Sequence, residues 1–383
     1  MFSFEFATAN RIIFGAGKLK ELSKQIEGNV KRLLFVCGHS SDTIPRVREI
    51  LSVLGISIIE FQVHGEPTID LVRAGVKAAQ NYDMVIGLGG GSVLDTGKAI
   101  AALVTNPGDV MDYLEVVGKG QPLVNAPLPY IAIPTTAGTG SEVTRNAVIE
   151  VSGQNVKVSL RSPLMLPRLA LVDPELTYHL PPEITASTGL DALTQLIEPF
   201  VSSKANPMTD SICREGMQHA AKSLRRAYEN GADKEARQGM SLASLFGGLA
   251  LANAGLGAVH GFAGPLGGML HAPHGALCAR LLPLVMEANI GALETRQPEH
   301  PALNRYAEVA KILTGAKTAT ARDGVRWTQQ LVNALKTPRL SKYGMNEGNF
   351  TEAVEKTLKA SSYKSNPISL NENELREILE KAL

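Results

Sequence analysis

Cysteine is scarce in this chain. Only Cys37, Cys213 and Cys278 occur among 383 residues, and no two of them form a CxxC pair. This spacing argues against a disulfide framework and against a zinc cluster built from several thiolates. We therefore expect a protein of a reducing compartment, the cytoplasm.

An excess of charge of either sign is also missing, since 38 basic residues face 37 acidic ones and the formal net charge is +1. No overall field would attract nucleic acid or an anionic membrane. The least charged stretch, residues 238–279, is interrupted by glycine, proline and histidine, which is not typical of a membrane-spanning helix. The expected partner is a small molecule, with no nucleic acid and no membrane.

The length of 383 residues predicts two domains. Strand-like apolar runs alternate with helical patterns up to residue 180, which predicts a parallel sheet covered on both faces. After Leu180-Pro181-Pro182 the strand-like runs end and helical patterns continue to Leu383, so the predicted domains are an α/β domain over residues 1–180 and an all-α domain over residues 181–383. The expected strands are 4–14, 32–37, 57–63, 84–88 and 130–133, the expected helices are 18–22, 44–54 and 69–80, and a hairpin is expected over 146–160.

A glycine loop follows one of these strands. The strand 84–88 runs into Gly89-Gly90-Gly91-Ser92-Val93-Leu94-Asp95-Thr96-Gly97-Lys98, and the residues after it have a helical pattern. A glycine turn that opens a helix presents backbone N–H groups and the positive end of the helix dipole to an anion such as a pyrophosphate. The alternative is a tight turn that needs glycine only for its backbone angles.

A second loop, Ile133-Pro134-Thr135-Thr136-Ala137-Gly138-Thr139-Gly140-Ser141-Glu142-Val143-Thr144, follows the strand 130–133 and is rich in hydroxyl and amide donors. By itself it is compatible with a polar surface loop. Two donor-rich loops after two apolar strands favour a dinucleotide site.

A candidate metal site lies in the helical half. Asp191 and Gln195 are four residues apart and hence share one helix face. His260 and His274 follow in the uncharged stretch, and two imidazoles with a carboxylate and an amide oxygen form an N2O2 set for a divalent metal. From spacing alone, core histidines and a solvated helix face explain the same residues.

GGGSVLDTGK and IPTTAGTGSEVT resemble the two cofactor signatures of the iron-containing, group III, alcohol dehydrogenases, and the GLDAL and PHG segments resemble that family's metal site. The resemblance covers nearly the whole chain. It implies an N-terminal dinucleotide-binding domain, a C-terminal helical metal domain with the architecture of dehydroquinate synthase, a homodimer, and NADP or NAD with Fe²⁺ or Zn²⁺ as cofactors. On this resemblance the cofactor residues are Gly90, Gly91, Ser92, Asp95, Thr135, Thr136, Thr144 and Lys157, and the metal residues are Asp191, Gln195, His260 and His274.

The chain departs from the family pattern at two positions. Gln195 stands where the family usually has a histidine ligand, and an amide oxygen is a poorer donor than imidazole, although glycerol dehydrogenases manage with three protein ligands. Gly264 stands where a histidine commonly relays protons. We expect His271, three residues before His274, to replace it as a catalytic residue.

These features predict an NAD(P)-dependent alcohol dehydrogenase or aldehyde reductase in which the metal is a Lewis acid. Residues 238–279 contain no Asp, Glu, Lys or Arg, which favours a small, neutral alcohol or aldehyde as substrate. Three alternatives remain open, of which one is a catalytically inactive binding protein. A metal-free reductase of the maleylacetate type is compatible with Gln195, and a sugar-phosphate cyclase related to dehydroquinate synthase would need several cations for a phosphate.

The nicotinamide preference is predicted from the residues after the strand 32–37. Relatives specific for NAD commonly have an Asp at the position of Gly38, where it repels a 2′-phosphate. Here Gly38 leaves room, and His39, Ser40 and Ser41 offer donors. We therefore expect Gly38 and Ser40 to contact the cofactor and NADP(H) to be accepted at least as well as NAD(H).

Overall fold

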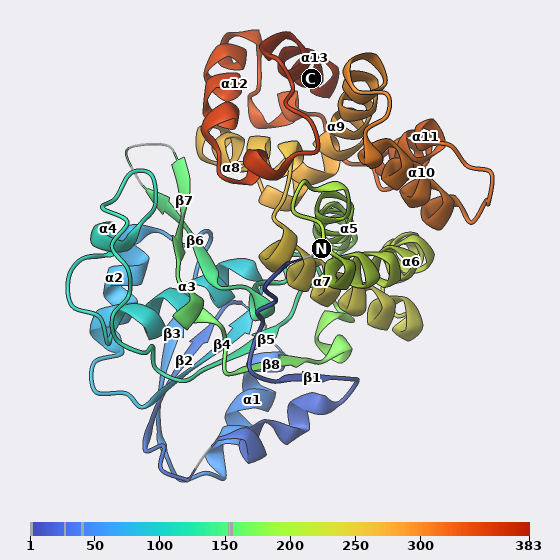
Figure 1. The fold of residues 1–383 in the computed structure, drawn as a ribbon. Helices are drawn as coiled ribbons and strands as arrows, with labels where there is room; N and C mark the ends of the chain where they lie inside the picture. The colour runs from blue at the N-terminus through green and yellow to red at the C-terminus, as the bar shows by residue number, and fades with distance from the viewer. Residues whose placement is uncertain (1–2, 27, 40–41, 152, 154–155) are drawn as a thin grey trace. The chain divides into compact units, whose positions relative to one another are not determined.

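The computed structural model describes residues 3–26, 28–39, 42–151, 153 and 156–383. They form two compact units, of which one is Ala7–His179 and the other is Leu180–Leu383 together with the first residues up to Phe6. Figure 1 shows strands in the first unit and helices throughout the second.

The first unit contains a sheet of six parallel strands in the order β1-β8-β5-β4-β2-β3. A two-stranded antiparallel hairpin, β6 and β7, is separate from it. The strands are β1 Ile12–Phe14, β2 Arg32–Cys37, β3 Ser57–Gln62, β4 Met84–Gly89, β5 Tyr130–Pro134, β6 Asn146–Val151, β7 Val156–Arg161 and β8 Leu169–Val172. Its α-helices are α1 Thr43–Ser52, α2 Ile69–Ala78, α3 Gly91–Leu103 and α4 Val110–Tyr113, and its 3-10 helices are η1 Lys18–Gln25, η2 Ser141–Val143, η3 Pro163–Met165 and η4 Pro174–Thr177.

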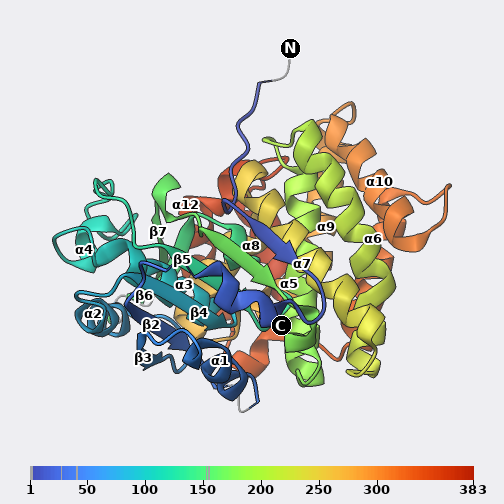
Figure 2. The same ribbon diagram turned by 90° about the horizontal axis from the view of Figure 1, so that it is seen from below.

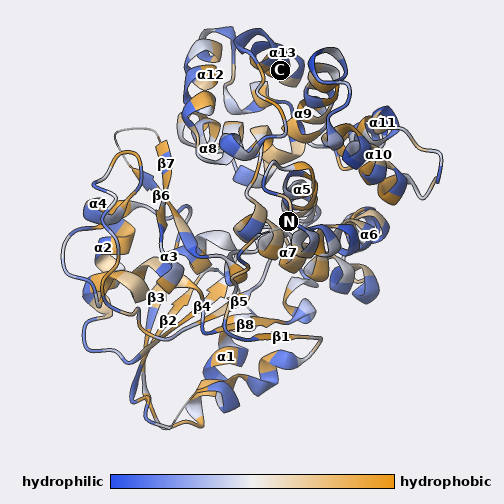
Figure 3. Cartoon of the chain, viewed as in Figure 1, coloured by the Kyte–Doolittle hydropathy of each residue, from blue (hydrophilic) through white to orange (hydrophobic). Residues whose placement is uncertain are grey.

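Helices cover both faces of the sheet, as Figures 1 and 2 show. Successive side chains of a strand point to opposite faces, so Phe35 and Cys37 pack in one apolar cluster with α1 and η1 while Leu34 and Val36 pack in another with α3. Both faces of the central strands are therefore apolar, and Figure 3 shows these strands in orange.

The sheet has a switch point between β2 and β4. From β2 the chain crosses to β3 on one side, and from β4 it crosses to β5 on the other. In open α/β sheets ligands bind outside the carboxyl ends of the strands at such a point. Gly38, directly after β2, and Gly90, directly after β4, stand at these two strand ends.

The second unit is built from helices. Two of them, α7 and α8, meet at a bend of 100° near Gly255, whose φ of +72° favours glycine. The α-helices are α5 Pro182–Val201, α6 Pro207–Glu229, α7 Lys234–Ala254, α8 Ala258–Leu270, α9 His274–Arg296, α10 Pro301–Thr314, α11 Ala321–Ala334, α12 Phe350–Lys359 and α13 Glu372–Ala382. The 3-10 helices are η5 Leu340–Tyr343, η6 Glu347–Asn349 and η7 Ser362–Ser365.

One described helix, α9, is by length and composition apolar enough to cross a membrane, and the bent pair α7 and α8 passes the same test only if taken as one span. However, 83% of the apolar window of α9 is buried inside the structure. Such burial is what the core helix of a globular protein shows, and it accounts for the low charge of this part of the chain.

The predicted fold class, a parallel α/β part followed by a helical part, is confirmed. The strand expected over residues 4–14 is wrong for most of its length, because only Ile12–Phe14 pair, with β8. Strand β8 itself was not expected. The hairpin over 146–160 is present as β6 and β7.

Candidate active site

Helix α5 supplies the carboxylates of the candidate metal site. Asp191 and Gln195 are one turn apart, as expected, and Glu198 follows three residues later on the same side. All three side chains are buried. Asp191 Oδ1 and Gln195 Oε1 are buried oxygens without a hydrogen-bond partner. Because an unsatisfied buried acceptor costs about 1–3 kcal/mol, two such atoms on one helix face indicate a missing ligand.

His260 stands in the first turn of α8 and is held by Glu198. Glu198 Oε2 lies 2.7 Å from His260 Nδ1, and Glu198 Oε1 accepts a 2.7 Å hydrogen bond from the backbone N–H of Val259. A Cβ atom at Gly257 would lie 2.8 Å from Glu198 Oε1, so glycine is needed there for the carboxylate to approach. This arrangement directs the other ring nitrogen, Nε2, toward Asp191, whose Oδ1 is 3.3 Å away.

Helix α9 begins at His274, directly after Pro273, and adds two further donors. His274 Nε2 lies 3.9 Å from Asp191 Oδ1. Cys278, one turn further along α9, places its Sγ 3.6 Å from His274 Nε2 and 3.8 Å from His260 Nε2. One ligand atom from each of Asp191, His260, His274 and Cys278 lies within 4.8 Å of the others.

The charges of this cluster suit a cation. Burial would lower the pKa of His260, but Cys278, Asp191 and Glu198 around the ring raise it well above its usual value. Burial would raise the pKa of Asp191, but the neighbouring histidines hold it below its usual value. Burial raises the pKa of the Cys278 thiol to about 12.

Two predicted residues of this half are not part of the cluster of four donors. Gln195 is buried, and its Oε1 would lie 3.4 Å from a Cβ atom at Gly247 on α7. His271 ends α8 with a left-handed φ of +49° and is exposed. The roles of Gln195 as a ligand and of His271 as a proton relay stay predictions.

In the first unit, the glycine loop opens α3 as the sequence predicts. Gly90 is the extended residue before the helix, and the helix starts at Gly91. The first N–H groups of a helix, here those of Gly91 and Ser92, have no acceptor within it and can face an anion. The second loop leaves little room for side chains here: a Cβ atom at Gly91 would lie 2.6 Å from Thr139, and one at Gly90 would lie 3.3 Å from Thr136, a tight contact.

A buried lysine joins the two loops. The ammonium of Lys98, 1% exposed, lies 2.7–3.0 Å from four oxygens, which share its three N–H donors: the carbonyl and hydroxyl oxygens of Ser141, Thr144 Oγ1 and the carbonyl oxygen of Asn146. Burial lowers its pKa, and the nearby carboxylates oppose this. Asp95 accepts hydrogen bonds from Ser141 Oγ and from the backbone N–H of Val148. Asp95 and Thr144 therefore order the loops around Lys98.

The other predicted cofactor residues lie in different surroundings. Gly38 lies beside α3, with its Cβ position 3.2 Å from Val93. Thr135 donates its backbone N–H to the carbonyl of Gly89. Lys157, on β7, forms an ion pair of 3.1 Å with Glu66. Ser40 lies outside the described residues.

The sequence analysis did not identify several residues that the structure places at these sites. Cys278 could have been found by the spacing of four residues from His274, the same rule that joined Asp191 and Gln195. Glu198 lies on the same face of α5. His64 follows β3, and its ring lies 4.5 Å from that of His39. The burial of Lys98 has no signal in the sequence.

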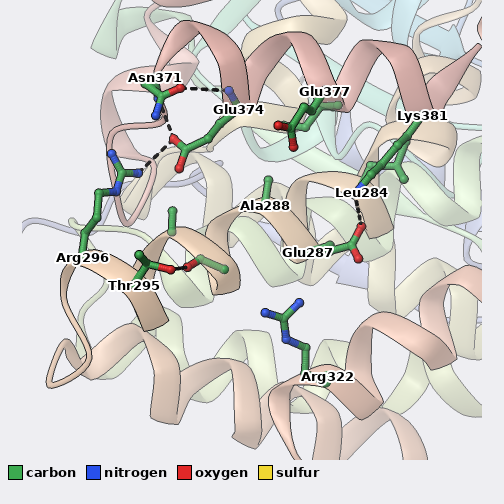
Figure 4. A pocket seen from close by; sticks show the side chains of 13 residues that line it. Leu284, Glu287, Ala288, Thr295, Arg296, Arg322, Asn371, Glu374, Glu377 and Lys381 are labelled. Carbon is green, nitrogen blue, oxygen red and sulfur yellow. Dashed lines mark hydrogen bonds and ion pairs between the residues drawn. The ribbon is translucent and has the colours of Figure 1, made fainter.

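A surface pocket of about 510 Å³ lies elsewhere, between α9, α11 and α13 (Figure 4). Its lining starts at Leu284, ten residues or roughly 15 Å along α9 from His274. Arg296 pairs with Glu374 and Lys381 pairs with Glu287, both at 3.0 Å, so much of its charge is already balanced. The pocket is not part of the donor cluster.

A parallel sheet with a glycine turn at its switch point, together with a helical unit that holds a buried donor cluster, is the arrangement expected of a metal-dependent enzyme that binds a dinucleotide. Residues 9–174 match the description "iron-containing alcohol dehydrogenase", and residues 185–383 match the C-terminal part of the same family. The chain belongs to the iron-containing alcohol dehydrogenase family. It is an oxidoreductase that acts on alcohols.

Relatives and solved structures agree with this assignment. Alcohol dehydrogenase 4 of Schizosaccharomyces pombe is 36% identical over 97% of this chain and 87% of its own length. A crystal structure of 1,3-propanediol oxidoreductase has a TM-score of 0.91 and 31% identity and covers both chains fully. Sulfoacetaldehyde reductase of Bifidobacterium kashiwanohense in complex with NAD⁺ has a TM-score of 0.87 and 26% identity, covering 100% of this chain and 99% of its own.

Proposed function

We propose that this chain interconverts a small, neutral alcohol and its aldehyde with NADP(H) or NAD(H), using a divalent metal held by Asp191, His260 and His274. The observation that carries the proposal is the convergence of Asp191 Oδ1, buried and without a hydrogen bond, with the two Nε2 atoms at 3.3 and 3.9 Å. Such donors fit Fe²⁺ or Zn²⁺.

A bound metal would supply Lewis-acid polarisation of the substrate oxygen. The residues of the chain prepare the site for it. Glu198 fixes the ring of His260 so that Nδ1 carries the proton and the Nε2 lone pair points to Asp191. Asp191 supplies a negative charge in a buried place, where it acts over a low dielectric. Gln195 lies on the same face of α5, but it is not part of the cluster of four donors.

Hydride transfer is the chemistry of the nicotinamide, and the protein orients it. The N–H groups at the start of α3 would hold the pyrophosphate, because Gly90 and Gly91 permit close approach of the backbone. Lys98 keeps the second loop, with Thr135 and Thr136, in a fixed conformation.

A 2′-phosphate would be accommodated beside Gly38. The carboxylate that repels it in NAD-specific enzymes is missing here. The exposed rings of His39 and His64, which follow β2 and β3 and lie 4.5 Å apart, offer nitrogen donors at this edge of the sheet. Alanine at either histidine should raise the KM for NADPH more than that for NADH.

The neutral character of the substrate is inferred from residues 238–279, which carry the two histidines and no Asp, Glu, Lys or Arg. A carboxylate, sulfonate or phosphate on the substrate would find no cation in this segment.

A cytoplasmic location is supported by three free cysteines, Cys37, Cys213 and Cys278. We also propose that the protein is a homodimer, and light scattering, which measures the mass of the particle in solution, tests this.

The test is metal analysis of the purified protein, followed by NAD(P)H oxidation with a panel of neutral, anionic and cationic aldehydes. We expect bound metal, turnover of small neutral aldehydes, and loss of turnover in a chelator. Full activity in a chelator would favour the metal-free reductase instead. Turnover of anionic aldehydes alone would overturn the substrate class.

A further inference from the structure

The thiol of Cys278 occupies a position that calls for an explanation beyond packing. Cys278 is completely buried and lies one turn after His274 on α9, so both side chains point from one helix face toward Asp191 and His260. The two other cysteines, Cys37 and Cys213, are not part of this or any other cluster of metal donors found among the described residues.

Four of the six distances between ligand atoms of the cluster lie within about 0.6 Å of those expected around a tetrahedral ion. Zinc binds nitrogen and oxygen at about 2.0–2.1 Å and sulfur at about 2.3 Å. In a tetrahedral site these bond lengths place a nitrogen and an oxygen ligand about 3.3 Å apart and a nitrogen and a sulfur ligand about 3.6 Å apart. Cys278 Sγ lies 3.6 Å from His274 Nε2 and 3.8 Å from His260 Nε2. Asp191 Oδ1 lies 3.3 and 3.9 Å from the same two nitrogens.

Hydrogen bonding does not account for this arrangement. A thiol has one proton and can donate it to only one of the two ring nitrogens that it contacts. Asp191 Oδ1 has no hydrogen bond although it is buried against these donors. Four ligand atoms that lie within 4.8 Å of one another, one of them a buried carboxylate oxygen without a hydrogen bond, suit a bound cation.

Cys278 is also better suited than Gln195 to be the fourth donor. The amide oxygen of Gln195 lies near Gly247 on α7, whereas the sulfur of Cys278 contacts both histidines. A thiolate is also a charged and softer donor than a neutral amide oxygen, and soft thiolate donors suit zinc.

We propose that Cys278 is the fourth protein ligand of the metal, in an Asp-His-His-Cys set that favours zinc over iron. The inference rests on the proposed function, since it presupposes the metal site. A coordinated thiol loses its proton, which passes to solvent when the metal binds. Thiolate ligands select zinc, whereas iron(II) is well served by imidazole and carboxylate. Zinc can accept a fifth donor during catalysis, so four protein ligands still admit a substrate oxygen.

The decisive measurement is the absorption spectrum of the protein loaded with cobalt(II). A thiolate ligand gives an intense sulfur-to-cobalt charge-transfer band in the near ultraviolet. We expect this band in the wild type and in the control variant Cys213→Ser, which loses a buried thiol on α6. We expect its loss in Cys278→Ser, with zinc affinity reduced by more than the roughly 10- to 100-fold that loss of an outer hydrogen-bond partner costs.

X-ray absorption of the zinc-loaded wild type needs no variant and covers the case in which Cys278→Ser does not fold. One sulfur neighbour at about 2.3 Å supports the proposal, and a shell of nitrogen and oxygen alone overturns it. Bound cobalt with normal turnover and no thiolate band would also overturn it while leaving the proposed function intact. A protein that binds neither zinc nor cobalt contradicts both.

Discussion

Glu198 Oε2 lies 2.7 Å from His260 Nδ1, while the other oxygen of the same carboxylate accepts the N–H of Val259 at 2.7 Å. The carboxylate thus accepts two hydrogen bonds from α8, one from the ring and one from the backbone. Because Nδ1 is the donor, Nε2 keeps its lone pair for a metal.

Replacing this carboxylate by an amide should therefore disturb the metal site. In Glu198→Gln one oxygen becomes an NH₂ group, which cannot accept either proton. If the amide oxygen accepts from Val259, the NH₂ donates to Nδ1 and forces the ring proton onto Nε2. We expect metal affinity to fall roughly 10- to 100-fold, as for other outer partners of metal ligands. Competition with a fluorescent zinc chelator measures this, and an unchanged affinity would show that Glu198 only fills space.

Asp191→Ala should lose the metal and abolish turnover while keeping its fold. Two neutral imidazoles and the remaining donors would have to bind a dication without this carboxylate. Lewis-acid stabilisation is worth several kcal/mol, so we expect kcat/KM to fall by at least about a hundredfold. Circular dichroism checks the fold, and Asp191→Asn, of equal size, is the matched control for charge. Near-normal activity would support the metal-free reductase.

Gln195→His tests the departure from the family pattern. Position 195 lies one turn after Asp191, so a histidine there directs its ring toward the same centre at a cost to the helix of only a few tenths of a kcal/mol. We expect the variant to lose its metal to EDTA several-fold more slowly. Its activity need not rise, because the additional imidazole ligand leaves less room for the substrate at the metal. Equal rates of loss, with a wild type that stays fully active in the chelator, would defeat the metal site.

The nicotinamide preference is tested at Gly38. We expect kcat/KM with NADPH to equal or exceed that with NADH, and Gly38→Asp to shift the ratio toward NADH by at least tenfold, or about 1.4 kcal/mol, because its charge repels the 2′-phosphate. Gly38→Ala is the control for crowding, since a Cβ atom there lies 3.2 Å from Val93. A wild type that prefers NADH tenfold contradicts the prediction.

Glu142 should make the stability of the first unit depend on pH. Burial raises its pKa from 4.5 to about 7, against the influence of Lys98. Because the pKa of Glu142 is raised in the folded state, the protonated carboxyl group contributes fully to the free energy of unfolding below pH 4.5. This contribution is lost as the pH rises through about 7. The shift corresponds to about 3 kcal/mol. Glu142→Gln should remove this loss and stabilise the protein at pH 8.

Unfolding in urea at about pH 5 and pH 8, followed by circular dichroism, measures the effect. Trp327 is the only tryptophan and lies on α11 in the second unit, so its fluorescence serves as an internal control. If Glu142→Gln and the wild type lose equal stability between the two pH values, the carboxyl group does not control it.

The strands of the sheet could be predicted because their pattern is local. Leu33 to Cys37 form a continuous apolar run, which a strand buried on both faces requires. β1 was predicted too long because Phe4 and Phe6 continue its alternation, although only Ile12–Phe14 find a partner. That partner, β8, is four residues long, too short for its pattern to stand out from a loop.

The metal donors of the site were predictable only in part. Residue types and spacing suggested a donor set that included Asp191, His260 and His274, but only the resemblance favoured a metal site over core histidines. This is because 69 and 14 residues separate the three positions and only tertiary packing joins α5, α8 and α9. Cys278 was set aside because cysteines were judged by their spacing from each other, whereas its neighbours are histidines. Whether Lys98 and Glu142 are buried depends on packing that the residue types do not encode.

The position of Lys98 has a consequence for how the cofactor is held and released. In many phosphate-binding loops a lysine reaches out to the phosphates. Here the ammonium is turned inward, onto oxygens of Ser141, Thr144 and Asn146. The pyrophosphate would then rest against the neutral N–H dipoles of α3 without an ion pair from this lysine. Added salt screens formal charges far more than short dipolar contacts, so we expect product dinucleotide to leave at nearly the same rate at low and at high ionic strength.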